Sequence, residues 1–175
     1  MSTPSLVVAD TTPLNYLVLI GRAEILRALS DEVLVPRAVW QELQHPRTPA
    51  VVSRWVQTPP AWLRVVDVQQ VDATLSLGAG ENEAISLALE QQVRVVLVDE
   101  RKGRAAAQAR GLLTLGTLNL IDLGDEEGLL DGVQAVHDLR QTSFREEESL
   151  FAHFEANMRV RRVARPAEAT GQTNN

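Results

Sequence analysis

The chain has 175 residues, the length of one ordinary domain. It contains no cysteine, which excludes a disulfide framework, a zinc–thiolate centre and a cysteine nucleophile, and fits a reducing cytosol. Its net charge of −6 argues against broad nucleic-acid binding. The N-terminus has neither a basic start nor a long apolar run, so we expect no signal peptide, no membrane span and a cytoplasmic location.

A buried strand is predicted at residues 5–9, because this apolar run is too short for a helix and ends at Asp10. Thr12 is expected to cap the following helix, with Pro13 at its first position and Gly21 at its end. Further along the chain we predict helices at 23–29, 37–44, 50–57, 81–92, 102–110, 118–124, 130–141 and 146–160, and extended segments at 31–36, 62–68, 93–99 and 112–116.

Short apolar strands thus alternate with helices along the chain. This order is typical of one α/β domain, here residues 1–160, with a central, mostly parallel sheet of four or five strands covered by helices on both faces. In the last helix, Leu150, Phe151, Phe154 and Met158 form an apolar stripe that favours an intramolecular core over a partner surface. Residues 161–175 lack apolar periodicity and are predicted to be a disordered tail.

The charges are unevenly distributed along the chain. "RKGRAAAQAR" (101–110) and "RVRRVAR" (159–165) each contain four cations and no acid, whereas acids concentrate at 122–131 and 146–148. A solvated helix face explains each basic run as well as a binding surface does. The low aromatic content, 4%, shows no base-stacking platform for nucleic acid.

Two of the predicted strands run directly into an aspartate, Asp10 and Asp99. The carboxyl ends of parallel strands meet at one edge of a sheet, which is where open α/β sheets bind ligands. If the two strands are neighbours, the two carboxylates lie close together. Like charges at that range raise each other's proton affinity unless a cation neutralises them, so a divalent metal is a natural partner.

The predicted helices supply three further acids. Glu42 lies near the end of helix 37–44, and Glu81 and Glu83 lie in the first turn of helix 81–92. An oxygen-only set of ligands fits Mg²⁺ or Mn²⁺ rather than zinc. Taken singly, each acid has an ordinary explanation as a helix cap, a first-turn acid or an exposed side chain. Only convergence of the set would indicate a site, and periodicity alone does not establish it.

The sequence resembles the PIN-domain nucleases, particularly VapC-like toxins and related prokaryotic proteins. The resemblance covers roughly residues 5–155 and runs in order through "VVADTTPLNYLVLIGRAEIL", "EVLVPRAVWQEL", "LGAGENEAISLALE", "VVLVDERKGRAAAQARGLLTLGTLNLI" and "LRQTSFREEESLF". It implies a PIN-like fold whose acid quartet binds Mg²⁺ or Mn²⁺ and hydrolyses RNA with a water molecule as the nucleophile.

Carried over by motif, the quartet has Asp10 first, Glu42 second and Asp99 fourth. The third acid falls on Glu81, eighteen residues before Asp99, where the family's toxins commonly have aspartate; Glu83 remains the rival. The resemblance implies Asp10, Asp99 and Glu81 as metal ligands, with one or two ions. Thr12 matches a small polar position that touches the first acid or the metal.

Three cations follow Asp99 directly and are expected to contact RNA phosphates: Arg101, Lys102 and Arg104. The resemblance further implies the toxin of a type II toxin–antitoxin pair, with an antitoxin partner and a homodimer. A catalytically weak or inactive interaction module of the same fold is the alternative. A phosphatase of the haloacid dehalogenase type is disfavoured, because the sequence after the first strand is Asp10-Thr11-Thr12 rather than Asp-x-Asp.

Overall fold

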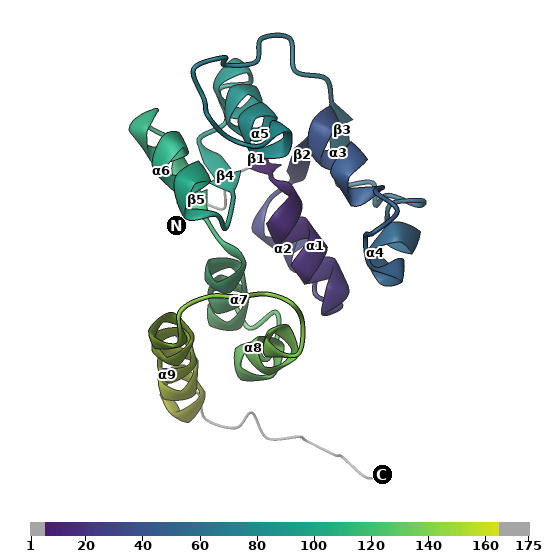
Figure 1. Cartoon of the computed structure of the whole chain (residues 1–175). Coiled ribbons are helices and arrows are strands. Elements are labelled where there is room, and N and C mark those ends of the chain that lie inside the picture. Colours follow the sequence, from purple (N-terminus) through teal and green to yellow (C-terminus); the bar gives the residue numbers. More distant parts are fainter. Residues whose placement is uncertain (1–5, 165–175) are drawn as a thin grey trace.

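The computed structural model describes residues 6–164 (Figure 1). The strands are β1 (Leu6–Ala9), β2 (Glu32–Pro36), β3 (Leu63–Val66), β4 (Val95–Leu97) and β5 (Leu113–Leu115). The helices are α1 (Thr11–Leu19), α2 (Ile25–Leu29), α3 (Arg37–Leu43), α4 (Ala50–Trp55), α5 (Ala79–Glu90), α6 (Arg101–Ala109), α7 (Thr117–Glu126), α8 (Gly132–Arg140) and α9 (Glu148–Ala164).

The five strands form one parallel sheet in the order β3-β2-β1-β4-β5. This confirms the prediction of a single α/β domain with a central parallel sheet. Strand β1 is the central strand and pairs with β4 through Val8 opposite Val96 and Ala9 opposite Leu97. Asp10 and Asp99 therefore follow neighbouring strands and lie at the same edge of the sheet.

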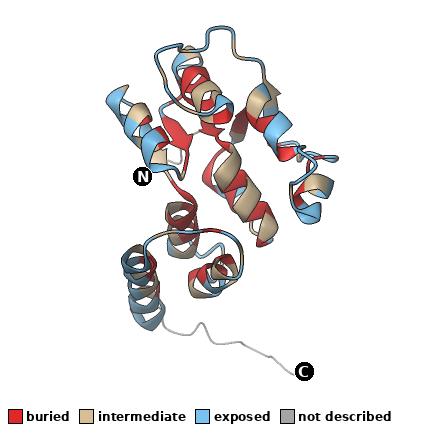
Figure 2. Cartoon of the chain, viewed as in Figure 1, coloured by how far each residue is buried: buried red, intermediate tan, exposed pale blue. Residues whose placement is uncertain are grey.

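Both faces of the sheet are buried, as the continuous apolar strands require. Val7, Val33 and Leu97 face a large core shared with α1, α2, α3, α7, α8 and α9. Val8, Leu34 and Val96 are the immediate neighbours of those residues in their strands. They face the opposite side of the sheet and belong to a smaller core shared with α5 and α6. Figure 2 shows the central strands β1, β2 and β4 almost entirely buried, whereas the edge strands β3 and β5 are partly exposed and the helices are buried along their inward sides.

Helices α7, α8 and α9 pack against one another and form the end of the molecule farthest from α5 (Figure 1). Phe151, Phe154 and Met158 of α9 are buried in the large core, and Leu150 packs partly against it. The apolar stripe of α9 therefore faces the interior, as predicted. No helix within residues 6–164 is long and apolar enough to cross a membrane.

Helix α1 begins earlier than predicted. Thr11 is its first residue, and Asp10, in extended conformation, precedes it without a capping bond from its side chain. Thr12 is therefore not the helix cap. Pro13 still fits, because the first four N–H groups of a helix have no partner within the helix.

Helix α5 also begins earlier, at Ala79 after the extended Gly78. Glu81 consequently lies in the first turn and Glu83 beyond it. At the other end of the chain, α9 continues to Ala164 instead of ending at residue 160. Residues 161–164, assigned to the tail from sequence, are therefore helical, and the rest of the predicted tail lies outside the described residues.

Candidate active site

Asp10 lies at the carboxyl edge of the sheet with only 4% of its surface exposed. Its backbone N–H donates to the Leu97 carbonyl at 2.9 Å, which joins the end of β1 to β4. Burial raises the pKa of Asp10 to about 7; the charges of Glu81, Glu42 and Asp99 add to this rise, and the Thr11 N–H opposes it. The four acids of the predicted quartet thus lie within electrostatic range of one another.

The Asp99 carboxylate is held by hydrogen bonds from Thr117, the first residue of α7. The Thr117 backbone N–H donates to Oδ1 of Asp99 at 2.7 Å, and the Thr117 hydroxyl donates to Oδ2 at 2.7 Å. Burial raises the pKa of Asp99, and these two hydrogen bonds and the charge of Arg104 oppose the rise. Sequence reasoning missed Thr117, because it lies eighteen residues after Asp99 and carries no motif of its own.

Glu42 reaches the site from α3. The Thr11 hydroxyl donates to Oε2 of Glu42, and the Gly80 N–H donates to Oε1 at 3.1 Å. A Cβ atom at Gly80 would lie 2.7 Å from Oε2, so only glycine lets α5 approach this carboxylate so closely. Two threonine hydroxyls thus donate to acids of the predicted quartet, Thr11 to Glu42 and Thr117 to Asp99, whereas Thr12 lines the cleft described below.

Glu81 reaches the site from the first turn of α5. Its Oε1 atom is buried and has no hydrogen-bond partner within residues 6–164. Burial raises the pKa of Glu81, and the neighbouring Glu100 adds to the rise. A Cβ atom at Gly103 would lie 2.6 Å from Oε1, so α6 also approaches this carboxylate through a glycine.

Glu83 has a different environment. Its Oε2 atom accepts a hydrogen bond of 2.8 Å from the Ala38 N–H in the first turn of α3. One of the otherwise unbonded N–H groups at the start of that helix is thereby satisfied. Of the two candidates for the third acid, Glu81 lies with Asp10, whereas Glu83 is engaged at the start of α3.

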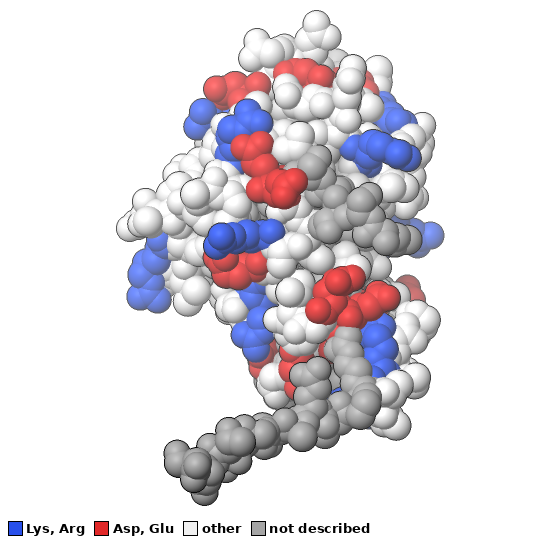
Figure 3. Space-filling view, turned by 180° about the vertical axis from the view of Figure 1, so that it is seen from behind, with Lys and Arg blue, Asp and Glu red and all other residues white. Residues whose placement is uncertain are grey.

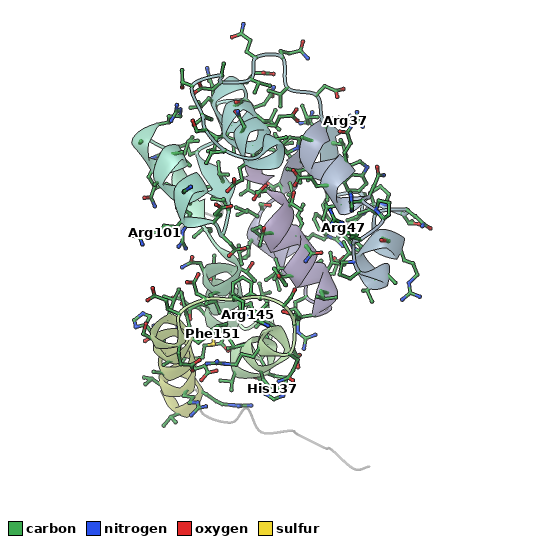
Figure 4. All side chains as sticks on the ribbon, viewed as in Figure 1. Arg37, Arg47, Arg101, His137, Arg145 and Phe151 are labelled. Carbon is green, nitrogen blue, oxygen red and sulfur yellow. The ribbon has the colours of Figure 1, made fainter. Side chains whose placement is uncertain are left out.

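A cleft of about 710 Å³ opens beside Asp99. It is lined by α1, the start of α6, the segment between α8 and α9, and α9 itself. Of the three cations predicted to contact RNA phosphates, Arg101 and Arg104 line this cleft and Lys102 does not. Figure 4 shows Arg101 at the start of α6 and Arg145 on the segment that leads into α9.

Seven residues of the cleft come from the C-terminal part of the chain, and sequence reasoning missed the four among them with charged or imidazole side chains: Arg145, Glu146, Glu147 and His153. All four belong to the stretch from the end of α8 into α9. Nothing in their local pattern indicates proximity to Asp99. Only packing of α9 on α7 and α8 brings them there.

The chain matches a family model described as a PIN domain over residues 6–159. The chain belongs to the PIN-domain family. PIN domains are generally nucleases that use divalent metals, so this PIN domain has a nuclease-type fold. A search of curated proteins finds no match.

The acids of this PIN domain suit a hard divalent cation in their chemistry. All four donors are carboxylates, Asp10 is buried and Asp99 half-buried, both with raised pKa values, and Oε1 of Glu81 is buried without a partner within residues 6–164. Within residues 6–164, no three acidic or histidine side chains are already grouped tightly enough to hold a metal ion. Hydrogen bonds engage both oxygens of Glu42 and both oxygens of Asp99, and each oxygen can still accept a further bond.

Proposed function

We propose that this PIN-domain protein is an Mg²⁺- or Mn²⁺-dependent endoribonuclease. The observation that carries the proposal is the buried Asp10, whose pKa is raised to about 7 beside three further carboxylates. In a fold without a bound cation, such a set is destabilising. A divalent ion would convert this repulsion into attraction, and a metal-dependent nuclease requires that arrangement.

Asp10, Asp99 and Glu81 would hold the ion, with Glu42 beside them. When bound, the ion would lower the pKa of water and offset negative charge on the phosphoryl group. Thr117 keeps the Asp99 carboxylate in a fixed orientation, and Gly80 and Gly103 keep space for the carboxylates of Glu42 and Glu81. Thr11, rather than Thr12, is the hydroxyl that holds Glu42.

RNA phosphates would be contacted by Arg101 and Arg104, which line the cleft beside Asp99. The guanidinium group suits this role, because it donates in a planar fork to phosphate oxygens. Lys102 is exposed on α6 outside the cleft lining, so we expect at most a long-range electrostatic contribution from it.

RNA cleavage by variants of the acids tests this proposal. We expect purified protein to cleave single-stranded RNA with Mg²⁺ or Mn²⁺, and Asp10→Asn to lower kcat by at least about 100-fold. Two glutamates of α5 provide a matched pair of further variants. Glu81→Gln should lose activity similarly. Glu83→Gln should retain it, because the amide oxygen can still accept from the Ala38 N–H. Cleavage that is equal for wild type and Asp10→Asn would contradict the proposal.

We further propose that the protein is the toxin of a type II toxin–antitoxin pair, with a cognate antitoxin and a homodimeric state. This part rests on the resemblance to VapC-like proteins. Expression in a bacterial host should arrest growth, Asp10→Asn should not, and the product of a small neighbouring reading frame should relieve the arrest. Growth arrest by Asp10→Asn as strong as by wild type would contradict a toxin that acts through RNA cleavage.

A non-catalytic interaction module is the second candidate. It is favoured by the hydrogen bonds that already occupy both oxygens of Glu42 and of Asp99. Calorimetric titration separates the two functions. A nuclease must bind Mg²⁺ or Mn²⁺ with an affinity that Asp10→Asn weakens, whereas a module of this kind would show no divalent binding.

A further inference from the structure

The arginines of this protein fall into two groups. Eight of them form ion pairs with carboxylates of the chain: Arg22, Arg37, Arg64, Arg110, Arg140, Arg159, Arg161 and Arg162. Seven form no ion pair within residues 6–164: Arg27, Arg47, Arg54, Arg94, Arg101, Arg104 and Arg145. Of these seven, Arg101, Arg104 and Arg145 line the cleft beside Asp99. Guanidinium groups left without a carboxylate in a concave site are available to an anion from outside.

Arg145 is held in place by the protein itself. Its Nη1 donates to the carbonyls of Phe144 at 2.8 Å and Thr142 at 3.0 Å. Nε and Nη2 of Arg145 donate to no group in the described part of the chain. A guanidinium anchored by one nitrogen loses less conformational entropy when the other two bind a ligand.

The neighbouring side chain, Phe144, ties this segment to the acid site. It is buried, and its ring lies edge-on to Tyr16 of α1 at 5.0 Å and to Phe151 of α9 at 6.1 Å between centroids. The Tyr16 and Ser143 hydroxyls are 3.0 Å apart. Because α1 begins directly after Asp10, these contacts set the position of Arg145 relative to the quartet.

The cleft also contains carboxylates, and two of them belong electrostatically to the acid site. Glu100 raises the pKa of Glu81, and Glu146 raises that of Asp99. A divalent cation bound at the quartet would offset part of this negative charge. The cleft lining itself holds three guanidinium groups, of Arg101, Arg104 and Arg145, and the carboxylates of Asp99, Glu100, Glu146 and Glu147, so phosphate binding would depend on that cation.

We propose that this cleft binds the single-stranded RNA next to the cleaved bond, with Arg145 as a substrate-binding residue alongside Arg101 and Arg104. The inference rests on the proposed nuclease function and adds a contact from the C-terminal part of the chain. Tyr16 and the exposed His153 also line the cleft and offer rings to an unstacked base. Guanidinium groups together with rings suit single-stranded RNA better than an acidic protein segment.

The test uses Asp10→Asn as the background, so that RNA is bound but not cut. Fluorescence anisotropy with a labelled single-stranded RNA in Mg²⁺, over a range of salt concentrations, measures affinity and its salt dependence. Arg94→Ala is the matched control, because Arg94 is exposed, forms no ion pair among the described residues and precedes β4 at the opposite end from Asp99.

Arg145→Ala should weaken binding about fivefold to tenfold and reduce the slope of log affinity against log salt by about 0.7, the value for one phosphate contact on a single strand. Arg101→Ala should do the same, and Arg94→Ala should change neither quantity. Arg145→Lys keeps the charge and should keep the slope, which separates loss of a contact from loss of folding. In the active protein, with Asp10 unchanged, Arg145→Ala should raise KM more than it lowers kcat.

Equal affinity and slope for Arg145→Ala and Arg94→Ala would overturn the inference. Displacement of the RNA by a poly-glutamate peptide of equal charge, as efficiently as by unlabelled RNA, would also overturn it and would indicate a docking site for an acidic protein. Absence of cleavage by wild type would instead contradict the nuclease function, and the binding series would still decide the role of Arg145.

Discussion

The two ends of the molecule treat carboxylates in opposite ways. At the carboxyl edge of the sheet, Asp10, Glu42, Glu81 and Asp99 lie within electrostatic range of one another and form no ion pair with a described residue. Among α7, α8 and α9, acids lie beside arginines: Arg161 contacts Asp122 and Asp125, Arg162 contacts Asp131, and Arg140 contacts Glu148 and Glu155. Arginines thus hold the acids among α7, α8 and α9 in ion pairs, whereas the four acids at the carboxyl edge of the sheet form no ion pair within residues 6–164.

The same comparison separates the two basic runs of the sequence. In the described part of the second run, Arg159, Arg161 and Arg162 all form ion pairs with acids of the region from α7 to α9, so these three arginines are structural. In 101–110, Arg110 pairs with Asp72, but Arg101 and Arg104 line the cleft without a pair. Figure 3 shows, on the face opposite to that of Figure 1, positive and negative groups lying next to one another rather than gathered by sign.

The largest expected stability effect concerns Asp10, at the carboxyl edge of the sheet. The pKa of Asp10 is raised from 3.8 to about 7, and at about 1.36 kcal/mol per unit this corresponds to at most about 4 kcal/mol of destabilisation at pH 7 and above. Since the folded state binds this proton more tightly than the unfolded state, metal-free protein should lose this stability as pH rises from about 4 to about 7. Asp10→Asn should therefore be more stable than wild type at pH 7.5 in a chelator, measured by denaturant unfolding.

Two controls accompany this measurement. The stability difference between Asp10→Asn and wild type should shrink as pH falls toward about 4, where Asp10 is protonated in the folded state and about half protonated in the unfolded state. Mg²⁺ at pH 7.5 should stabilise wild type and have a smaller effect on Asp10→Asn. An Asp10→Asn variant less stable than wild type at pH 7.5 would mean that the folded protein already compensates the negative charge of Asp10.

A smaller effect of opposite sign is expected at the helical end. Arg161 lies between two carboxylates that are mostly buried, with 22% of the Asp122 and 13% of the Asp125 side chain exposed. Arg161→Ala should lower the free energy of unfolding by about 1–3 kcal/mol, between the values for surface and buried ion pairs. Urea unfolding monitored by circular dichroism measures it. An unchanged unfolding midpoint would show that the ion pairs of Arg161 do not stabilise the packing of α7, α8 and α9.

The smallest effect is expected for a pair in full contact with solvent. Arg37 and Asp67 lie 2.9 Å apart with 47% and 66% of their side chains exposed. The Arg37 guanidinium lowers the pKa of the Asp67 carboxyl, but solvent and salt screen such pairs almost completely. Arg37→Ala should leave the thermal midpoint unchanged within error, and a shift as large as that of Arg161→Ala would show that burial does not govern these pairs.

Much of the fold could be predicted from sequence, because each strand and helix has its own local apolar pattern. The runs at 5–9 and 93–99 identify strands that end at Asp10 and Asp99, and parallel pairing then brings those ends to one edge. Helix boundaries were less predictable. The early starts at Thr11 and Ala79 depend on the extended backbones of Asp10 and Gly78, which periodicity does not report.

The acid set could be predicted only in part. Sequence pointed to Asp10, Glu42 and Asp99 and left Glu81 and Glu83 as alternatives, since both lie near the start of one helix. Their environments differ because Glu83 lies against the start of α3 and Glu81 against α6. Those contacts are between helices that are far apart in the chain.

The sequence by itself determined the α/β domain and the acids at its strand ends, because alternation of apolar runs with helices is a local property that sterics and burial enforce. Only the tertiary structure decided which charges are compensated. Arg161 meets its acids and Arg145 approaches Asp99 through the packing of α9 on α7 and α8. Coulomb interactions depend on distance in space, and a sequence does not contain that distance.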